Sequence, residues 1–136
     1  MAMQGDSESR IPALPQRDLW ALPEIKTLKI ERVRYRTPRK HAIAGKLIEA
    51  VEGIEIVVQT AGEIPIRALS PALHVGSAEI AENERVSAIS YRFFVLDEEP
   101  LRPGAPITLG WVGHPVPKGN TQFRYETPGG VVTRER

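Results

Sequence analysis

Cysteine is absent from the 136-residue sequence, and this absence excludes several kinds of chemistry at once. Without a thiol, the chain has no disulfide, no thiolate nucleophile, no cysteine-ligated zinc and no iron–sulfur cluster of its own. The lack of disulfides also removes one sign of export, but it does not show in which compartment the protein resides.

An excess of charge of one sign and a long apolar run are missing as well. The 18 basic and 17 acidic residues argue against a uniformly basic nucleic-acid-binding protein. The longest stretch without a charged residue, 103–117, contains four prolines and three glycines, which do not suit a membrane span. The first residues lack the basic start and apolar run of a secretory signal, so the compartment is unknown and the cytoplasm is the default expectation.

Motifs of catalytic and phosphate-binding sites are also lacking. The sequence has no nucleophile elbow, no phosphate-binding loop and no glycine-rich dinucleotide fingerprint. His41, His74 and His114 lack the close spacing of metal ligands, and the acidic stretch 97–99 lacks the further oxygen donors of a calcium loop. Aromatic residues make up 6% of the chain, too few for a sugar-binding platform. We therefore expect no catalytic residue, no metal site and no cofactor.

Turn-forming residues and short β-branched runs dominate what is present. The 11 glycines and 12 prolines are typical of a turn-rich β-protein and disfavour a helical bundle. About seven short strand-like runs follow one another between residues 25 and 126 at fairly regular spacing. The pattern predicts a single antiparallel β-sandwich, immunoglobulin-like in the broad sense, over residues 24–117. Within residues 118–136 we expect an edge strand that includes Phe123 and Tyr125, followed by a loose tail over residues 127–136.

The expected strand pattern is irregular in two places. The apolar alternation of residues 28–35 changes phase once, which predicts a β-bulge near Glu31 and Arg32. Residues 41–52 carry apolar side chains at helical spacing, although Gly45 disfavours a helix. We expect this segment to form either a short helix or a short strand.

Residues 1–23 form a proline-containing arm without a sustained hydrophobic period. Because proline fixes φ and removes a backbone donor, we expect this arm to be extended or irregular. It is either a disordered terminus or a segment that packs on its own domain or on a neighbour. The apolar side chains available for such docking are Ile11, Leu14, Leu19, Trp20 and Leu22.

Basic residues are concentrated in one expected strand and the residues after it. Arg32, Arg34 and Arg36 alternate along the chain, and Arg39 and Lys40 follow. Alternate side chains share one face of a strand at a spacing of about 6.6–6.8 Å, which suits phosphates or carboxylates. The other interpretation is a solvated edge strand that is protected by its charge, or paired with Glu49, Glu52 and Glu55, which follow in the sequence.

Two functions from different classes are compatible with these features. The leading hypothesis is a non-catalytic structural or accessory subunit that docks onto other protein subunits through its terminal arms and a sheet edge. The alternative is a small module that binds an anionic ligand, a nucleotide or phosphate, on the arginine-rich strand face. A metal-carrying sandwich built on the histidines is a minor third hypothesis. All three rest on exclusion and on common roles of β-sandwiches, so the partner and the oligomeric state stay open.

Overall fold

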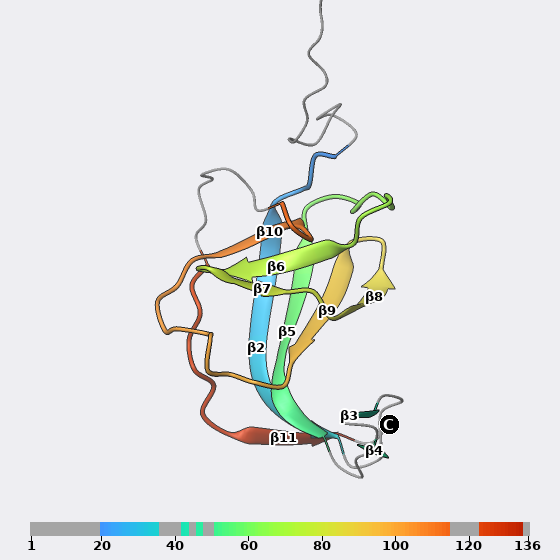
Figure 1. Cartoon of the computed structure of the whole chain (residues 1–136). Coiled ribbons are helices and arrows are strands. Elements are labelled where there is room, and N and C mark those ends of the chain that lie inside the picture. The colour runs from blue at the N-terminus through green and yellow to red at the C-terminus, as the bar shows by residue number, and fades with distance from the viewer. Residues whose placement is uncertain (1–19, 36–41, 44–45, 48–50, 115–122, 135–136) are drawn as a thin grey trace, which may run out of the picture.

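The computed structural model describes residues 20–35, 42–43, 46–47, 51–114 and 123–134. These ranges contain strands and turns but no helix, which confirms the predicted all-β class. The strands form a five-stranded sheet, a three-stranded sheet and a two-stranded hairpin. Figure 1 shows that the strands of the three-stranded sheet run across those of the five-stranded sheet. Within the described ranges, there is no helix with the length and hydrophobicity needed to cross a membrane.

The larger sheet is mixed and has the strand order β11-β2-β5-β9-β8. Its strands are β2 (Ile25–Tyr35), β5 (Val51–Thr60), β8 (Asn83–Ser87), β9 (Ser90–Val95) and β11 (Val131–Arg134). All neighbours pair antiparallel except β11, which runs parallel to β2. The expectation of a purely antiparallel fold with a loose tail was therefore wrong. The chain returns along the side of the molecule (Figure 1) and enters the sheet beside β2 in the same direction.

The smaller sheet has the order β10-β6-β7 and is antiparallel throughout. Its strands are β6 (Pro71–Val75), β7 (Ala78–Ile80) and β10 (Ile107–Trp111). A tight turn joins β6 to β7 and places Gly76 at a φ of 61°, a conformation that glycine adopts without steric cost. Strand β6 lies in the centre of this sheet and all five of its residues are buried.

The hairpin of β3 (Ala42–Ile43) and β4 (Lys46–Leu47) lies at the same end of the molecule as β11 in Figure 1. These residues belong to the segment 41–52, for which a short helix or a short strand was predicted. Its described parts are strands, so the strand alternative is confirmed for them. The helix-disfavouring residue, Gly45, lies outside the described residues.

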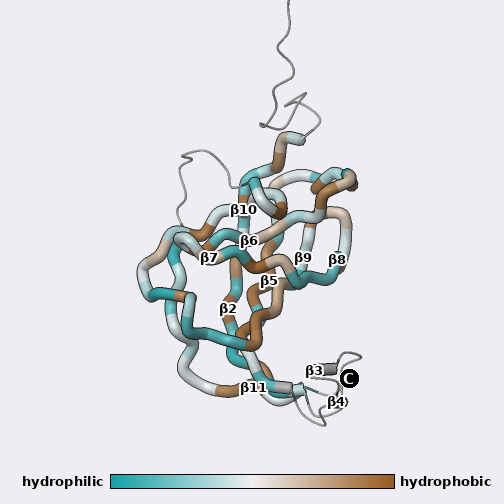
Figure 2. Tube along the Cα trace, in the orientation of Figure 1, coloured by the Kyte–Doolittle hydropathy of each residue, from teal (hydrophilic) through white to brown (hydrophobic). Residues whose placement is uncertain are grey.

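The main hydrophobic core lies between the two sheets. Apolar residues, brown in Figure 2, are concentrated along β5, at the centre of the larger sheet. The largest fully buried side chains of the core come from both sheets and from the segments that connect them, and they include Ile54, Ile56, Phe93, Leu73, Ile107, Ile64 and Tyr125. At one end, Trp20 packs edge-on against Trp111, with ring centroids 5.2 Å apart. The Trp111 indole N–H donates a hydrogen bond of 2.8 Å to the Trp20 carbonyl.

Strand β2 buries side chains on both of its faces. Leu28 and Ile30 pack against the main core, whereas Val33 and Tyr35 form a second buried cluster with Phe94 on the other face. The register with β5 is continuous from Thr27 to Tyr35, and its one shift lies between Ile25 and Thr27. The bulge predicted near Glu31 and Arg32 was therefore wrong. The apolar alternation changes phase there because the strand changes the face that it buries.

The second cluster requires a glycine at position 53. A Cβ added to Gly53 would lie 2.5 Å from the Val95 carbonyl oxygen and 2.8 Å from Cζ of Phe94. We predict that Gly53→Ala lowers the free energy of unfolding by about 1–3 kcal/mol, because the buried ring and backbone must move. Urea denaturation measures this loss. Gly129→Ala, with no described atom within 4 Å of its added Cβ, is the control. Equal stability of both variants and the unaltered protein would contradict the packing described here.

Candidate functional site

The structure describes two residues of the predicted arginine row, and both are paired with glutamates. Arg32 and Arg34 lie two residues apart on a regular part of β2 and therefore share a face, as the alternation predicts. Arg32 Nη1 lies 2.8 Å from Oε1 of Glu98, and Arg34 Nη2 lies 3.3 Å from Oε1 of Glu52. The remaining members of the row, Arg36, Arg39 and Lys40, lie outside the described residues.

Arg32 belongs to a side-chain clamp that joins three segments of the chain. Its guanidinium contacts both carboxylate oxygens of Glu98, and the Tyr125 hydroxyl donates to the same carboxylate at 3.2 Å. The clamp connects β2 to the loop after β9 and to the segment before β11. The hydrogen bond from Arg32 is the main cause that lowers the pKa of Glu98. Burial and the nearby Glu98 charge raise the pKa of Tyr125 to about 12.

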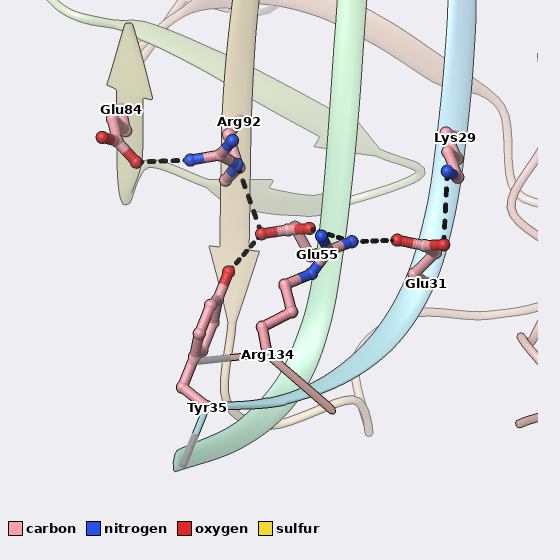
Figure 3. Close-up of polar contacts among 7 residues, drawn as sticks. All are labelled: Lys29, Glu31, Tyr35, Glu55, Glu84, Arg92 and Arg134. Atoms are coloured by element: carbon pink, nitrogen blue, oxygen red, sulfur yellow. Dashed lines mark hydrogen bonds and ion pairs between the residues drawn. The ribbon is translucent and has the colours of Figure 1, made fainter. Parts of the chain in front are cut away.

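A second charged network lies on the other face of the larger sheet and centres on Glu55 (Figure 3). The Glu55 side chain is only 2% exposed, and Arg92 and Arg134 lie 3.3 and 3.4 Å from its oxygens. The Tyr35 hydroxyl donates a short hydrogen bond to the same carboxylate. Because a buried carboxylate is costly without partners, these three groups are what makes burial of Glu55 possible.

The network extends from Glu55 across the whole sheet. Arg134 also pairs with Glu31, which in turn contacts Lys29 at 3.4 Å. On the other side, Arg92 contacts Glu84 at 2.8 Å. Three carboxylates and three cations therefore compensate one another across β8, β9, β5, β2 and β11 (Figure 3). The network is neutral as a whole and fastens β11 to the sheet. Its most exposed charged side chain is that of Lys29, which is 69% exposed.

The sequence pattern alone did not predict this network. Glu55 was considered only as a partner of the arginine row, but it lies on the opposite face of the sheet from Arg32 and Arg34. A signal was nevertheless present, because Glu55 stands inside a run of apolar β-branched residues. A charge at the centre of a buried strand requires a compensating partner. The identity of that partner depends on strand order, which the sequence pattern did not supply.

The described histidines have ordinary structural surroundings. His74 is buried on β6, and its Nε2 lies 3.3 Å from the Trp111 carbonyl oxygen. His114 lies in a turn closed by backbone hydrogen bonds with Trp111, and His41 lies outside the described residues. In the part of the chain that the structure describes, no three His, Asp or Glu side chains are grouped so that they could hold a metal ion.

The described end of the N-terminal arm packs on its own domain. Trp20 contacts Trp111 as described above, and Leu22 packs against the main core. Both side chains are partly buried. The other three arm residues considered for docking, Ile11, Leu14 and Leu19, lie outside the described residues. The part of the arm closest to the sheet thus closes one end of the core.

One edge of the larger sheet is covered only in part. Strand β5 pairs with β2 from Ile25 onward, whereas β11 begins to pair only at Arg32. No strand among the described residues covers Ile25–Glu31 on that side, a stretch that we call the β2 edge. An open groove of about 300 Å³ lies where this edge meets β11, and it is lined by Ile30, Glu31, Arg32 and residues 128–132.

Comparison of the chain with protein-family models, with curated proteins and with solved structures found no match.

The loss of stability on removing a charge from the Glu55 network should depend on which residue is changed. We expect Glu55→Gln to lower the free energy of unfolding by about 1–3 kcal/mol, because the buried carboxylate loses its charged contacts while Arg92 and Arg134 keep some exposure and their other partners. Glu84→Gln removes a half-exposed member of the same network and should cost less than about 1 kcal/mol. Urea denaturation of both variants tests this order. Equal costs would show that the Glu55 carboxylate does not hold the network together.

The clamp predicts a loss of stability at alkaline pH. The folded state holds the Tyr125 proton up to a pKa of about 12, whereas an unfolded tyrosine has a pKa of about 10. The stabilising contribution is therefore complete below pH 10 and disappears as the pH rises from about 10 to about 12. We expect the free energy of unfolding to fall more steeply over this interval in the unaltered protein than in Tyr125→Phe. Parallel curves for the two proteins would contradict the assignment.

Proposed function

We propose that this protein is a non-catalytic structural or accessory subunit that docks onto a larger protein assembly mainly through a sheet edge. The observation that carries the proposal is the β2 edge, which the described part of the chain leaves without a neighbouring strand. Such an edge presents backbone donors and acceptors to which an extended segment of another chain can bind. Beside it, Val131 and Val132 of β11 are 48% and 38% exposed and add apolar surface.

The terminal arms have a smaller part in this proposal than the sequence alone indicated. Trp20 and Leu22 are already engaged with the core of their own domain. Near the C-terminus, Tyr125 is fully buried and belongs to the clamp. These contacts support a role for the two segments in building the domain that carries the edge. Docking through Ile11, Leu14 and Leu19 stays a prediction.

The alternative of an anion-binding module has less support. A phosphate at Arg32 would have to displace the two-point contact with Glu98, and at Arg34 it would have to displace Glu52. Binding by the row Arg32, Arg34, Arg36, Arg39 and Lys40 therefore stays a prediction. It would be recognised by affinity for inorganic phosphate that falls steeply with salt concentration.

The finer classification of the fold is also part of the proposal. We infer a sandwich that is immunoglobulin-like only in the broad sense of two packed β-sheets. Immunoglobulin sheets lie nearly aligned, whereas the strands of the two sheets cross in Figure 1. An orthogonally packed sandwich, with one sheet curved as a half-barrel, is the variant that we propose.

The docking function predicts a stable complex in the source of the protein. We expect the full chain, purified gently from native extract, to migrate well above its own 15.1 kDa on size-exclusion chromatography. Lysine-directed cross-linking followed by mass spectrometry should join Lys26 or Lys29, on the β2 edge, to another protein. Lys46 lies in a different sheet and serves as the internal control. A protein that migrates as a monomer and gives no cross-links to another chain would contradict the proposal.

A further inference from the structure

We propose that the β2 edge binds an extended segment of a partner protein in which apolar and acidic side chains alternate. The inference rests on the proposed docking function and specifies which edge is used and which chemistry the partner brings. It follows from the backbone, the apolar side chains and the charges of this edge, taken in turn.

The backbone of β2 extends beyond the part that β11 covers, so a further segment could pair with it next to β11. Strand β11 occupies the fifth position of the sheet only beside Arg32–Tyr35. Before it, Gly129 and Gly130 are exposed and have no described atom within 4 Å of an added Cβ. Residues 128–130 lead into β11 and line a groove with Ile30, Glu31 and Arg32. An added segment would lie along Ile25–Ile30 and end at this groove, with main-chain hydrogen bonds supplying affinity.

The opposite edge of the sheet is less suited to accept a strand. Strand β8 is five residues long and its register with β9 shifts between Arg85 and Ser87. Such irregularities interrupt the regular row of edge groups and are a common way to protect an edge. The β2 edge has a shift of its own between Ile25 and Thr27, but from Thr27 the register is regular through to Tyr35.

The inward side chains of the β2 edge leave the core incompletely covered. Leu28 and Ile30 are only partly buried, although their cross-strand partners Val58 and Ile56 are fully buried. Apolar side chains at alternate positions of an added strand would lie next to Leu28 and Ile30 and cover them. The proposed partner segment therefore carries apolar side chains at the positions next to Leu28 and Ile30.

The outward side chains supply the charge that selects the partner. Lys26 is exposed at the register shift, and the Lys29 side chain is 69% exposed. Two acidic residues lie nearby: Glu31 contacts both Lys29 and Arg134, and Glu24 is exposed just before the edge. Acidic side chains on the outward face of an added strand would pair with the two lysines. A second copy of the same edge would bring two lysines of its own to the contact, whereas an acidic segment of a different protein would pair with both lysines of the edge.

Synthetic peptides test this chemistry without knowledge of the partner. The first probe is a fluorescent, end-capped seven-residue peptide of alternating valine and glutamate, and the second replaces glutamate with lysine. We expect saturable binding of the valine–glutamate peptide to the full chain by fluorescence anisotropy. The valine–lysine peptide should bind at least ten-fold more weakly, and backbone amide shifts should be confined to the β2 edge and its neighbours. Absence of binding, or equal binding of both peptides, would overturn the inference.

A charge-matched pair of variants separates local recognition from net charge. Lys26→Glu with Lys29→Glu should weaken binding of the valine–glutamate peptide at least ten-fold. Arg67→Glu with Arg102→Glu changes the net charge equally at exposed sites off the edge and should change binding less than two-fold. An equal loss in both variants would show attraction by net charge alone and would contradict the inference.

The same variants, returned to the source of the protein, distinguish this inference from the docking function. Loss of the native complex in the Lys26→Glu, Lys29→Glu variant but not in the control would support both. A complex that persists in both variants would leave the docking function standing and overturn the inference. If the unaltered protein forms no complex, the docking function is contradicted, and the peptide measurements still decide the chemistry of the edge.

Discussion

Strand β2 has to bury side chains on both of its faces, and the rest of the structure depends on this constraint. Its first half directs Leu28 and Ile30 into the core between the sheets, and its second half directs Val33 and Tyr35 to the other face. The second half is flanked by strands on both sides, because β11 pairs with it. The first half is flanked by β5 alone among the described strands. The β2 edge, to which we assign docking, exists because β11 covers only the second half of β2.

Ion pairs hold β11 against the second half of β2, whereas the first half has no such cover among the described strands. The Glu55 network fastens β11 to the second half of the strand through Arg134, and the clamp ties Arg32 to Glu98 and Tyr125. A buried ion pair can add little net stability and still be costly to break by removal of one partner. Here Arg134 holds the last residue of β11 against the sheet, and the clamp occupies Arg32, one of the arginines that otherwise suggested an anion site. Lys26 and Lys29 are then the exposed basic groups of the edge.

The sequence predicted the features that depend on local pattern. The all-β class followed from turn residues and β-branched runs, and the shared face of Arg32 and Arg34 followed from simple alternation. The bulge near Glu31 was wrong because alternation identifies apolar positions without showing which face of the sheet they enter. Features that join distant segments were missed: Trp20 meets Trp111 across 91 positions, and Arg134 meets Glu31 across 103. Strand β11 was expected as a loose tail because its four residues carry little pattern of their own.

Hydrogen exchange along β2 tests the central claim most directly. Amide exchange should be measured residue by residue in the isolated protein and in its native complex. The account predicts that alternate amides of Ile25–Glu31 exchange rapidly in the isolated protein and become protected in the complex, while Val33 and Tyr35 are protected in both. Protection of the whole β2 edge in the isolated protein, or rapid exchange of its alternate amides in the complex, would contradict the account.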